Sequence, residues 1–232
     1  MRGPDESDKA RALALVPVSR ETLVRLERFV ELLLTWQRRI NFIAASTIPQ
    51  LWTRHIADSL QLLPLAPNAK VWVDFGSGGG FPGIPIACAL AGTRGAMVHL
   101  VESNGKKVAF LCEAVRQLAL PAEVHAMRTQ KFGESWPGSA DVVTARALAP
   151  LKTLCNQAFP LIARGATGVF PKGQDVEAEL TEAARYWTMQ AVKVPSKTSP
   201  EGCIVVITQL RPRKASRIDH DDGDSRQVGA SH

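Results

Sequence analysis

The chain shows two patterns of apolar and polar positions, a helical pattern before Lys70 and a strand-rich pattern after it. From Ser19 to about Ile40, apolar side chains recur every three or four positions, which predicts an amphipathic helix with Ser19 as its N-cap. A second helix is predicted over residues 48–62. Prolines at 64 and 67 close this part. We therefore expect residues 1–66 to form a helical N-terminal extension.

After Lys70, short β-rich runs alternate with helical runs, which is typical of parallel strands joined by crossover helices. The predicted strands cover residues 71–75, 97–102, 123–127, 141–145, 167–170 and 203–208, with a weaker one at 190–194. The predicted helices cover residues 82–91, 105–118, 151–162 and 176–188. The expected fold class is α/β, a doubly wound, mostly parallel seven-stranded sheet over residues 67–210. Residues 211–232 mix charges, Gly and Ser and are expected to be a disordered tail.

Composition and charge narrow the class of protein. Hydrophobic residues make up 45% of the chain and charged residues 22%, which are ordinary values for a soluble globular protein. The net charge of +6 favours a polyanionic partner such as a nucleic acid. No uninterrupted apolar stretch is as long as a membrane span, and the first residues do not resemble a secretory signal, so we expect a cytoplasmic protein with no membrane partner.

The cysteines predict neither a disulfide framework nor a metal centre. They are widely spread, with no C-x-x-C pair and no histidine at metal-ligand spacing, at positions Cys88, Cys112, Cys155 and Cys203. We therefore expect no metal site.

The strongest candidate for chemistry is a glycine-rich turn after the first predicted strand. Glycines at 76, 78 and 80 leave room for a ligand and permit the positive φ angles of a tight turn. Pro82 and Pro85 suit the first turn of a helix, whose free N–H groups attract an anion. The turn is therefore expected to bind a phosphate or the carboxylate of an amino-acid-like ligand.

Two ligand classes fit this turn. From Gly78 it satisfies the dinucleotide pattern G-x-G-x-x-G, and from Asp74 it satisfies D-x-G-x-G-x-G, the first motif of Rossmann-like methyltransferases. We favour the second, because its first glycine directly follows the strand. Glu102 ends the next strand, where its carboxylate can accept hydrogen bonds from ribose hydroxyls in either class. Two alternatives stay open: an NAD(P)-dependent oxidoreductase, and a non-catalytic RNA-binding module on the same fold.

Four further pieces of sequence occur in a characteristic order. They are R-H-x-x-D-S at Arg54–Ser59, F-P-G-I-P at Phe81–Pro85, Arg146-Ala147 and Lys172-Gly173. With these motifs the chain resembles the bacterial small-subunit rRNA guanine-N7 methyltransferases, formerly called glucose-inhibited division protein B, over about Trp36–Val206. The resemblance implies a Rossmann-like class I methyltransferase fold, S-adenosyl-L-methionine as cofactor, and methylation of N7 of one guanine in 16S rRNA, free or within the small ribosomal subunit. We also expect a monomer.

The resemblance also assigns roles to individual residues. It implies that Gly76 and Phe81 line the cofactor pocket, that Glu102 is the ribose-binding acid, and that Arg146 lies beside the cofactor and the acceptor base. Thr129 and Gln130 fall where the family contacts the adenine. The full set of expected cofactor-binding residues is Asp74, Gly76, Gly78, Gly80, Phe81, Glu102, Thr129, Gln130 and Arg146. Charge suggests RNA contacts at Arg38, Arg39, Arg54 and Lys172.

The implied reaction needs no catalytic base. Guanine N7 has an in-plane lone pair and no proton, so the protein has only to position it, a contribution that can reach roughly 7–11 kcal/mol. The planar fork of Arg146 suits a bidentate acceptor, such as a phosphate, guanine O6 or the methionine carboxylate, and makes it the candidate for positioning. His55 and Asp58 share one face of a predicted helix, and we favour a structural role for them over a proton shuttle.

Overall fold

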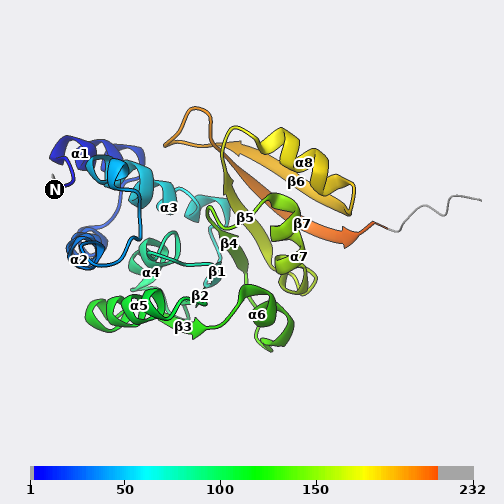
Figure 1. Cartoon of the computed structure of the whole chain (residues 1–232), viewed down its shortest axis with the longest axis horizontal. Coiled ribbons are helices and arrows are strands. Elements are labelled where there is room, and N and C mark those ends of the chain that lie inside the picture. The colour runs from blue at the N-terminus through cyan, green and yellow to red at the C-terminus, as the bar shows by residue number, and fades with distance from the viewer. Residues whose placement is uncertain (1–2, 214–232) are drawn as a thin grey trace, which may run out of the picture.

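The computed structural model describes residues 3–213, and its first part is helical (Figure 1). Helices α1 (Glu6–Leu15) and α2 (Arg20–Gln37) come first. They are followed by short turns of helix at Ala45–Gln50, Trp52–Ala57, α3 (Asp58–Leu60) and Leu63–Leu65. The Ser19 side chain accepts a hydrogen bond from the Thr22 N–H, which confirms the predicted N-cap.

Two details of this helical part differ from the sequence prediction. Helix α1 was not expected, because its first turn is strongly charged. It is capped by Asp5, whose side chain accepts a hydrogen bond from Ser7 N–H. The single helix predicted over 48–62 is divided into a 3-10 turn, a π-helical turn at Trp52–Ala57 and a short α-helix. Pro49 lies inside the 3-10 turn, where its missing N–H interrupts a regular α-helix.

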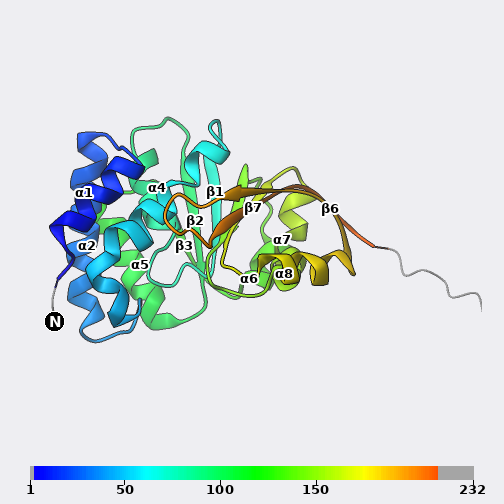
Figure 2. The ribbon, with the colours of Figure 1, turned by 90° about the horizontal axis from the view of Figure 1, so that it is seen from above.

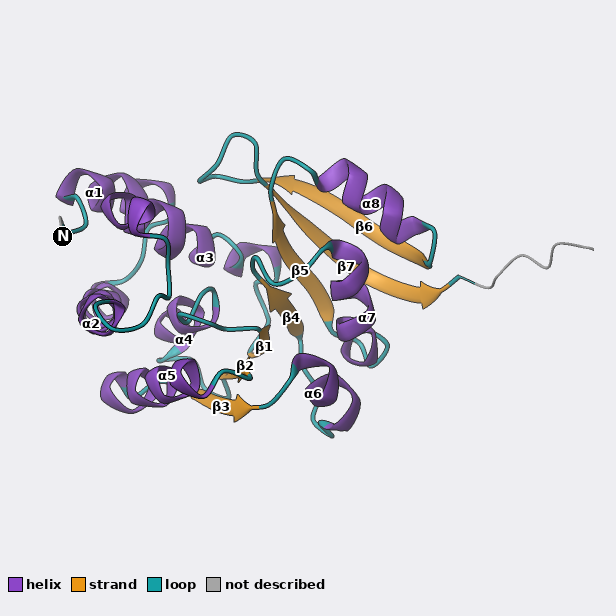
Figure 3. Ribbon diagram, viewed as in Figure 1, coloured by secondary structure: helices purple, strands orange, loops and turns teal. Residues whose placement is uncertain are grey.

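A seven-stranded sheet forms the centre of the molecule (Figure 3). Its strands are β1 (Val71–Phe75), β2 (Met97–Glu102), β3 (Ala122–Ala126), β4 (Val142–Ala145), β5 (Thr167–Lys172), β6 (Trp187–Pro195) and β7 (Cys203–Pro212). Their order is β3-β2-β1-β4-β5-β7-β6. Strands β1 to β5 are parallel, and β7 is antiparallel to both β5 and β6. This confirms the expected mostly parallel, seven-stranded sheet.

The chain end matches the sequence prediction less closely. Strand β7 continues to Pro212, so the sheet extends past the predicted boundary at 210, and the rest of the expected tail, 214–232, lies outside the described residues. Helix α8 (Val176–Ala184) ends four residues before the predicted end at 188, because β6 already begins at Trp187. The weak strand predicted at 190–194 is this longer β6.

Helices cover both faces of the sheet (Figure 2). On one face lie α4 (Gly83–Leu90) and α5 (Gly105–Leu118), with α2 packed against both. On the other lie α6 (Thr129–Ser135), α7 (Leu151–Ile162) and α8. Each face has its own cluster of buried apolar side chains. Helix α6 was not predicted, since it is short and only Phe132 and Gly133 on it are buried.

The N-terminal helices have no core of their own. Phe29 of α2 is fully buried, with its ring centroid 5.4 Å from that of Phe81 and 6.3 Å from that of Phe110 on α5. The segment Trp52–Leu60 lies close to the carboxyl end of β4, where Arg146 contacts Arg54, His55 and Asp58. Within residues 3–213, no helix is long and apolar enough to span a membrane.

Candidate active site

The glycine turn after β1 has the conformation that its sequence predicts. Gly76, Gly78 and Gly80 have φ angles of 66°, 54° and 90°, in the left-handed region that favours glycine. The N–H groups of Gly76 and Ser77 both donate to the carbonyl of Val101 on β2, at 2.9 and 3.1 Å. A β-carbon at Gly76 would lie 2.6 Å from Leu148 Cδ1, so a larger residue there would have to displace the Leu148 side chain.

The carboxylates of two residues hold this turn in place through hydrogen bonds from backbone N–H groups. Glu102 at the end of β2 accepts hydrogen bonds from the N–H groups of Gly78 (3.0 Å) and Asn104 (2.7 Å). Asp74 is fully buried in β1, and its Oδ2 accepts from Gly83 N–H at 3.1 Å. Its Oδ1 has no hydrogen-bond partner among the described residues. Burial raises the pKa of the Asp74 carboxyl to about 7.

A cavity of about 440 Å³ opens at the carboxyl ends of β1, β2 and β4. Five of the nine expected cofactor-binding residues line it: Gly76, Glu102, Thr129, Gln130 and Arg146. The other four, Asp74, Gly78, Gly80 and Phe81, are not among its lining residues. Asp74, Gly78 and Gly80 build the turn, and Phe81 is buried against Phe29 and below the guanidinium of Arg146. We call this hollow the turn cavity.

A second cavity, of about 550 Å³, lies on the other side of the segment that follows β4. Arg146, Ala147 and Leu148 line both cavities and thus form the wall between them. Ala147 has a φ of 51°, which is uncommon for a residue with a β-carbon and marks a constrained bend in this wall. We call the second hollow the outer cavity.

Arg146 is held by the helical segment that contains the R-H-x-x-D-S motif. Its Nη2 donates to His55 Nδ1 at 2.9 Å, and its Nη1 donates to the Arg54 carbonyl at 3.1 Å and approaches Asp58 Oδ2 at 3.5 Å. The guanidinium carbon lies 5.0 Å from the centre of the Phe81 ring. His55 and Asp58 therefore act together by binding the same arginine from two sides.

These contacts define the protonation of His55. Because Nδ1 accepts from Arg146, the proton of the neutral ring is on Nε2, which lies 2.9 Å from Thr47 Oγ1. That hydroxyl in turn donates to the Ala44 carbonyl at 2.8 Å. Burial, with the positive charge of Arg146, lowers the pKa of His55 to about 3, so the ring is neutral at pH 7. The structural role expected for the motif agrees with this geometry.

Asp58 connects the motif to the loop between β6 and β7. Its Oδ1 accepts hydrogen bonds from Gln61 Nε2 at 2.8 Å and from Thr198 Oγ1 at 2.7 Å. Gln61 also contacts Ser196 and accepts the Lys197 N–H. Four of these residues, Asp58, Gln61, Ser196 and Thr198, line the outer cavity, so polar groups from distant parts of the chain meet there.

The four basic residues proposed for RNA binding occupy different surroundings. Arg54 is exposed and lines the outer cavity. Lys172 also lines it, but its ammonium is paired with Glu179 at 2.5 Å, donates to the Ala149 carbonyl and is only 9% exposed. Arg38 and Arg39 are exposed at the end of α2 and are not among the residues lining either cavity.

Eight residues that line the turn cavity were not among the expected site residues, and Leu148, Lys107 and Gln157 are three of these eight. Leu148 covers Gly76, Lys107 stands at the start of α5, and Gln157 reaches the cavity from α7. The Gln157 Oε1 is buried and has no hydrogen-bond partner among the described residues. Of these three, only Lys107, in a basic pair before an amphipathic helix, carried any signal in the sequence.

Comparison with known proteins gives one consistent family. The model of a family described as rRNA small subunit methyltransferase G matches residues 22–203. A relative of the same name from a Bradyrhizobium species is 59% identical over 201 residues, covering 87% of this chain and 90% of the relative. Another, from Nitrobacter hamburgensis, is 56% identical over 207 residues, covering 89% and 80%.

Solved structures with low sequence identity share the fold. An O-methyltransferase from Bacillus cereus in complex with SAH aligns with a TM-score of 0.56 at 12% identity, covering 88% of this chain and 98% of that one. A cofactor-bound protein from MTB aligns with a TM-score of 0.58 at 13% identity, covering 90% and 98%. The fold is thus the class I methyltransferase fold that the sequence predicted.

Proposed function

The chain belongs to the rRNA small subunit methyltransferase G family, and on this basis we propose that it transfers a methyl group from S-adenosyl-L-methionine to N7 of a guanine in 16S rRNA. The observation that carries the proposal is the pair of cavities separated by Arg146–Leu148. The turn cavity receives the methyl donor and the outer cavity receives the acceptor base. The shared wall brings the two reactants to the same residues.

The residues of the turn cavity fit the proposed donor. Glu102 offers a carboxylate for ribose hydroxyls, and Gln157 Oε1 is an unpaired acceptor for an amine. The left-handed glycine turn removes β-carbons where a ligand approaches β1. Thr129 and Gln130 stand at the start of α6, at the adenine side in this proposal. When bound, S-adenosylmethionine supplies an electrophilic methyl group on a sulfonium.

Methyl transfer then depends on how these residues position guanine N7 relative to the methyl group of the donor. The lone pair of guanine N7 forms the new N–C bond as the S–C bond breaks, and positive charge moves from sulfur to the base. The reaction releases no proton and needs no base. The Nδ1 lone pair of His55, which could otherwise accept a proton, already accepts a hydrogen bond from Arg146. Asp58 at 3.5 Å partly offsets the charge of Arg146, which would otherwise oppose a developing positive charge in its neighbourhood. We assign Arg146 the orientation of the donor and the acceptor.

The direct test maps modified nucleosides of 16S rRNA by mass spectrometry in cells that lack the protein. We expect one 7-methylguanosine to be lost and to return when the gene is restored. If every 7-methylguanosine persists in the deletion strain, the proposed acceptor is wrong. Equilibrium binding separates the oxidoreductase alternative: the proposal requires affinity for S-adenosylhomocysteine, and affinity for NAD(H) instead would refute it.

A Gly78→Asp variant tests the alternative of a binding-only protein. The new side chain would start 3.6 Å from the Gly76 carbonyl, beside the Glu102 carboxylate, and would obstruct the donor site. Aspartate tolerates a positive φ better than most residues, so the fold should persist. We expect methylation to be lost with RNA affinity retained, whereas Gly92→Asp, where nothing lies within 4 Å, retains both. Methylation by Gly78→Asp at the normal rate would contradict the assignment.

We also propose that the protein acts in the cytoplasm as a monomer, because its acceptor is ribosomal RNA and the site is built from one chain. Parallel assays with naked 16S rRNA and with small subunits at different stages of assembly determine which form is methylated. Light scattering of the purified protein, with and without RNA, tests whether the protein is a monomer.

A further inference from the structure

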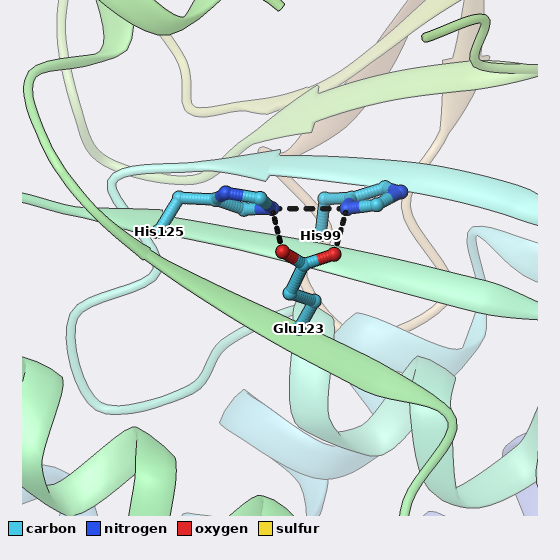
Figure 4. Close-up of side chains that lie close together, drawn as sticks. All are labelled: His99, Glu123 and His125. Carbon is cyan, nitrogen blue, oxygen red and sulfur yellow. Dashed lines mark hydrogen bonds and ion pairs between the residues drawn. The ribbon is translucent and has the colours of Figure 1, made fainter.

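Two histidines and a glutamate meet on the sheet below α6, away from both cavities. His99 on β2 is paired in register with Glu123 on β3, and His125 lies two positions further along β3, so all three side chains are on the same face. Figure 4 shows the two imidazole rings facing each other across the strands, with both oxygens of the Glu123 carboxylate turned toward them. The facing nitrogens, His99 Nδ1 and His125 Nε2, are 3.0 Å apart.

The three groups have the spacing of a metal-binding triad. His99 Nδ1 lies 3.6 Å from Glu123 Oε2, and His125 Nε2 lies 3.9 Å from Glu123 Oε1. Zinc binds imidazole nitrogen and carboxylate oxygen at roughly 2.0–2.2 Å, which places tetrahedral ligand atoms roughly 3.3 Å from one another. The observed separations bracket this value. Small rotations of the side chains would give all three ligands one common centre.

The surroundings of His99, Glu123 and His125 favour a bound metal ion over an ordinary ion pair between the carboxylate and the rings. The side chains of His99 and His125 are only 10% and 13% exposed, so the packing of the sheet holds both rings with their facing nitrogens 3.0 Å apart. Glu123 is 60% exposed, so an ion can enter from solvent beside it. Its carboxylate is within ion-pair distance of both rings, and neither separation is that of a hydrogen bond.

We propose that His99, Glu123 and His125 form a binding site for a first-row divalent transition metal ion, with Zn²⁺ as the best match. The ligand set of two histidines and one carboxylate leaves a fourth position for water. In the metal-free pair one facing nitrogen carries a proton. On binding, that ring changes tautomer, so both facing nitrogens coordinate and no net proton is released.

The place of the site in the fold assigns it a structural role. The His125 ring lies 4.8 Å from Phe132 on α6, and the His99 ring lies 4.7 Å from Trp136, the residue that follows α6. An ion would join the edge strand β3 to β2 and fix the rings on which α6 rests. The three residues are not among those that line the described cavities, so the ion takes no part in methyl transfer.

The expectation of no metal site came from spacing along the chain. His99 and His125 are 26 positions apart, and only the pairing of β2 with β3 brings them together. A search for C-x-x-C pairs or for the helical spacing H-x-x-x-H therefore does not detect a site whose ligands come from two paired strands.

The test uses the full-length chain without an affinity tag, stripped of metal with a chelator and titrated with ZnCl₂ in a calorimeter. We expect one equivalent of Zn²⁺ to bind saturably and the Tm to rise with its concentration. Substitution with Co²⁺ reports geometry, because four-coordinate Co²⁺ absorbs visible light far more strongly than six-coordinate Co²⁺. The absence of saturable binding would overturn the proposal.

Variants identify the ligands. Glu123→Gln, at an exposed position, should fold normally and bind Zn²⁺ at least about tenfold more weakly. His125→Gln should lose binding, and if that variant fails to fold, Glu123→Gln alone decides. Cys112→Ser serves as a control at another exposed side chain with a possible ligand atom and should bind as the native protein does. Equal Zn²⁺ affinity of Glu123→Gln and the native chain would refute the site. The methyl-transfer activity of Glu123→Gln should equal that of the native protein.

Discussion

At the scale of single residues, Arg146 lies between two buried titratable groups, His55 and Asp74. The charge of Arg146 lowers the pKa of both, but burial acts on the two groups in opposite directions. Burial disfavours the charged form, which for histidine is the protonated ring and for aspartate the deprotonated carboxylate. The two residues should therefore give opposite contributions to the pH dependence of stability.

For His55 the folded-state pKa of about 3 lies below the ordinary value of 6.5. Between these values the unfolded chain holds a proton that the folded chain does not, so the contribution of His55 to stability is lost as pH falls below 6.5. In urea denaturation series, the free energy of unfolding of the native protein minus that of His55→Gln should decrease with acidification, by up to about 1.4 kcal/mol per pH unit. A difference independent of pH would show that the ring is not buried in its neutral form.

For Asp74 the folded-state pKa of about 7 lies above the ordinary value of 3.8, and the sign is reversed. The folded chain keeps its proton where the unfolded chain has lost it, so the native protein loses stability relative to Asp74→Asn as pH rises from 3.8 to 7. The same denaturation series, recorded without cofactor, checks this. The prediction fails if the free energy of unfolding of the native protein minus that of Asp74→Asn stays constant or increases between pH 3.8 and pH 7.

At the scale of elements, the docking of α2 depends on a few large side chains. Phe29 is fully buried between Phe81 and Phe110, and Phe29→Ala should lower the free energy of unfolding by about 3–5 kcal/mol. Val24→Ala on the same helix, where the side chain is 48% exposed, should change it by less than about 0.5 kcal/mol. Thermal or urea unfolding measures both. Equal, small effects would mean that the N-terminal helices are not part of the cooperative core.

The turn after β1 and the segment after β4 depend on each other. Alanine at 76 would hold a positive φ, costing roughly 1–2 kcal/mol, and its β-carbon would displace Leu148. We expect Gly76→Ala to stay folded and to bind S-adenosylhomocysteine at least about tenfold more weakly in calorimetry. Gly92→Ala, with nothing within 4 Å, is the control and should bind normally. Unchanged affinity of Gly76→Ala would place the ligand away from this turn.

At the scale of the whole molecule, the local patterns predicted the sheet and most of the helices, because strand and helix periods are set by short-range burial. The first three strands and α5 lie within one residue of their predicted bounds. The division of residues 45–60 into three kinds of helix was not predictable, because the contacts that favour it, such as His55 with Arg146, come from far along the chain.

The candidate site was predictable where backbone conformation requires a residue type. The glycines at 76, 78 and 80 could be identified because a left-handed turn needs them, and Glu102 because it ends a strand next to that turn. Gln157 and Leu148 could not, since nothing in a helix or a loop sequence indicates which cavity a side chain will line. The pairing of Lys172 with Glu179 was likewise invisible, because it joins β5 to α8.

The wall formed by Arg146–Leu148 has a thermodynamic consequence. In the proposed arrangement, with the donor in the turn cavity and the acceptor in the outer cavity, a ligand that restricts this segment from one side alters its freedom on the other, and we expect the two affinities to be coupled. Reciprocity then requires that the factor by which S-adenosylhomocysteine changes the affinity for RNA equal the factor by which RNA changes the affinity for S-adenosylhomocysteine. Titrations in both orders should return the same factor, different from one, and Leu148→Ala should bring it nearer to one.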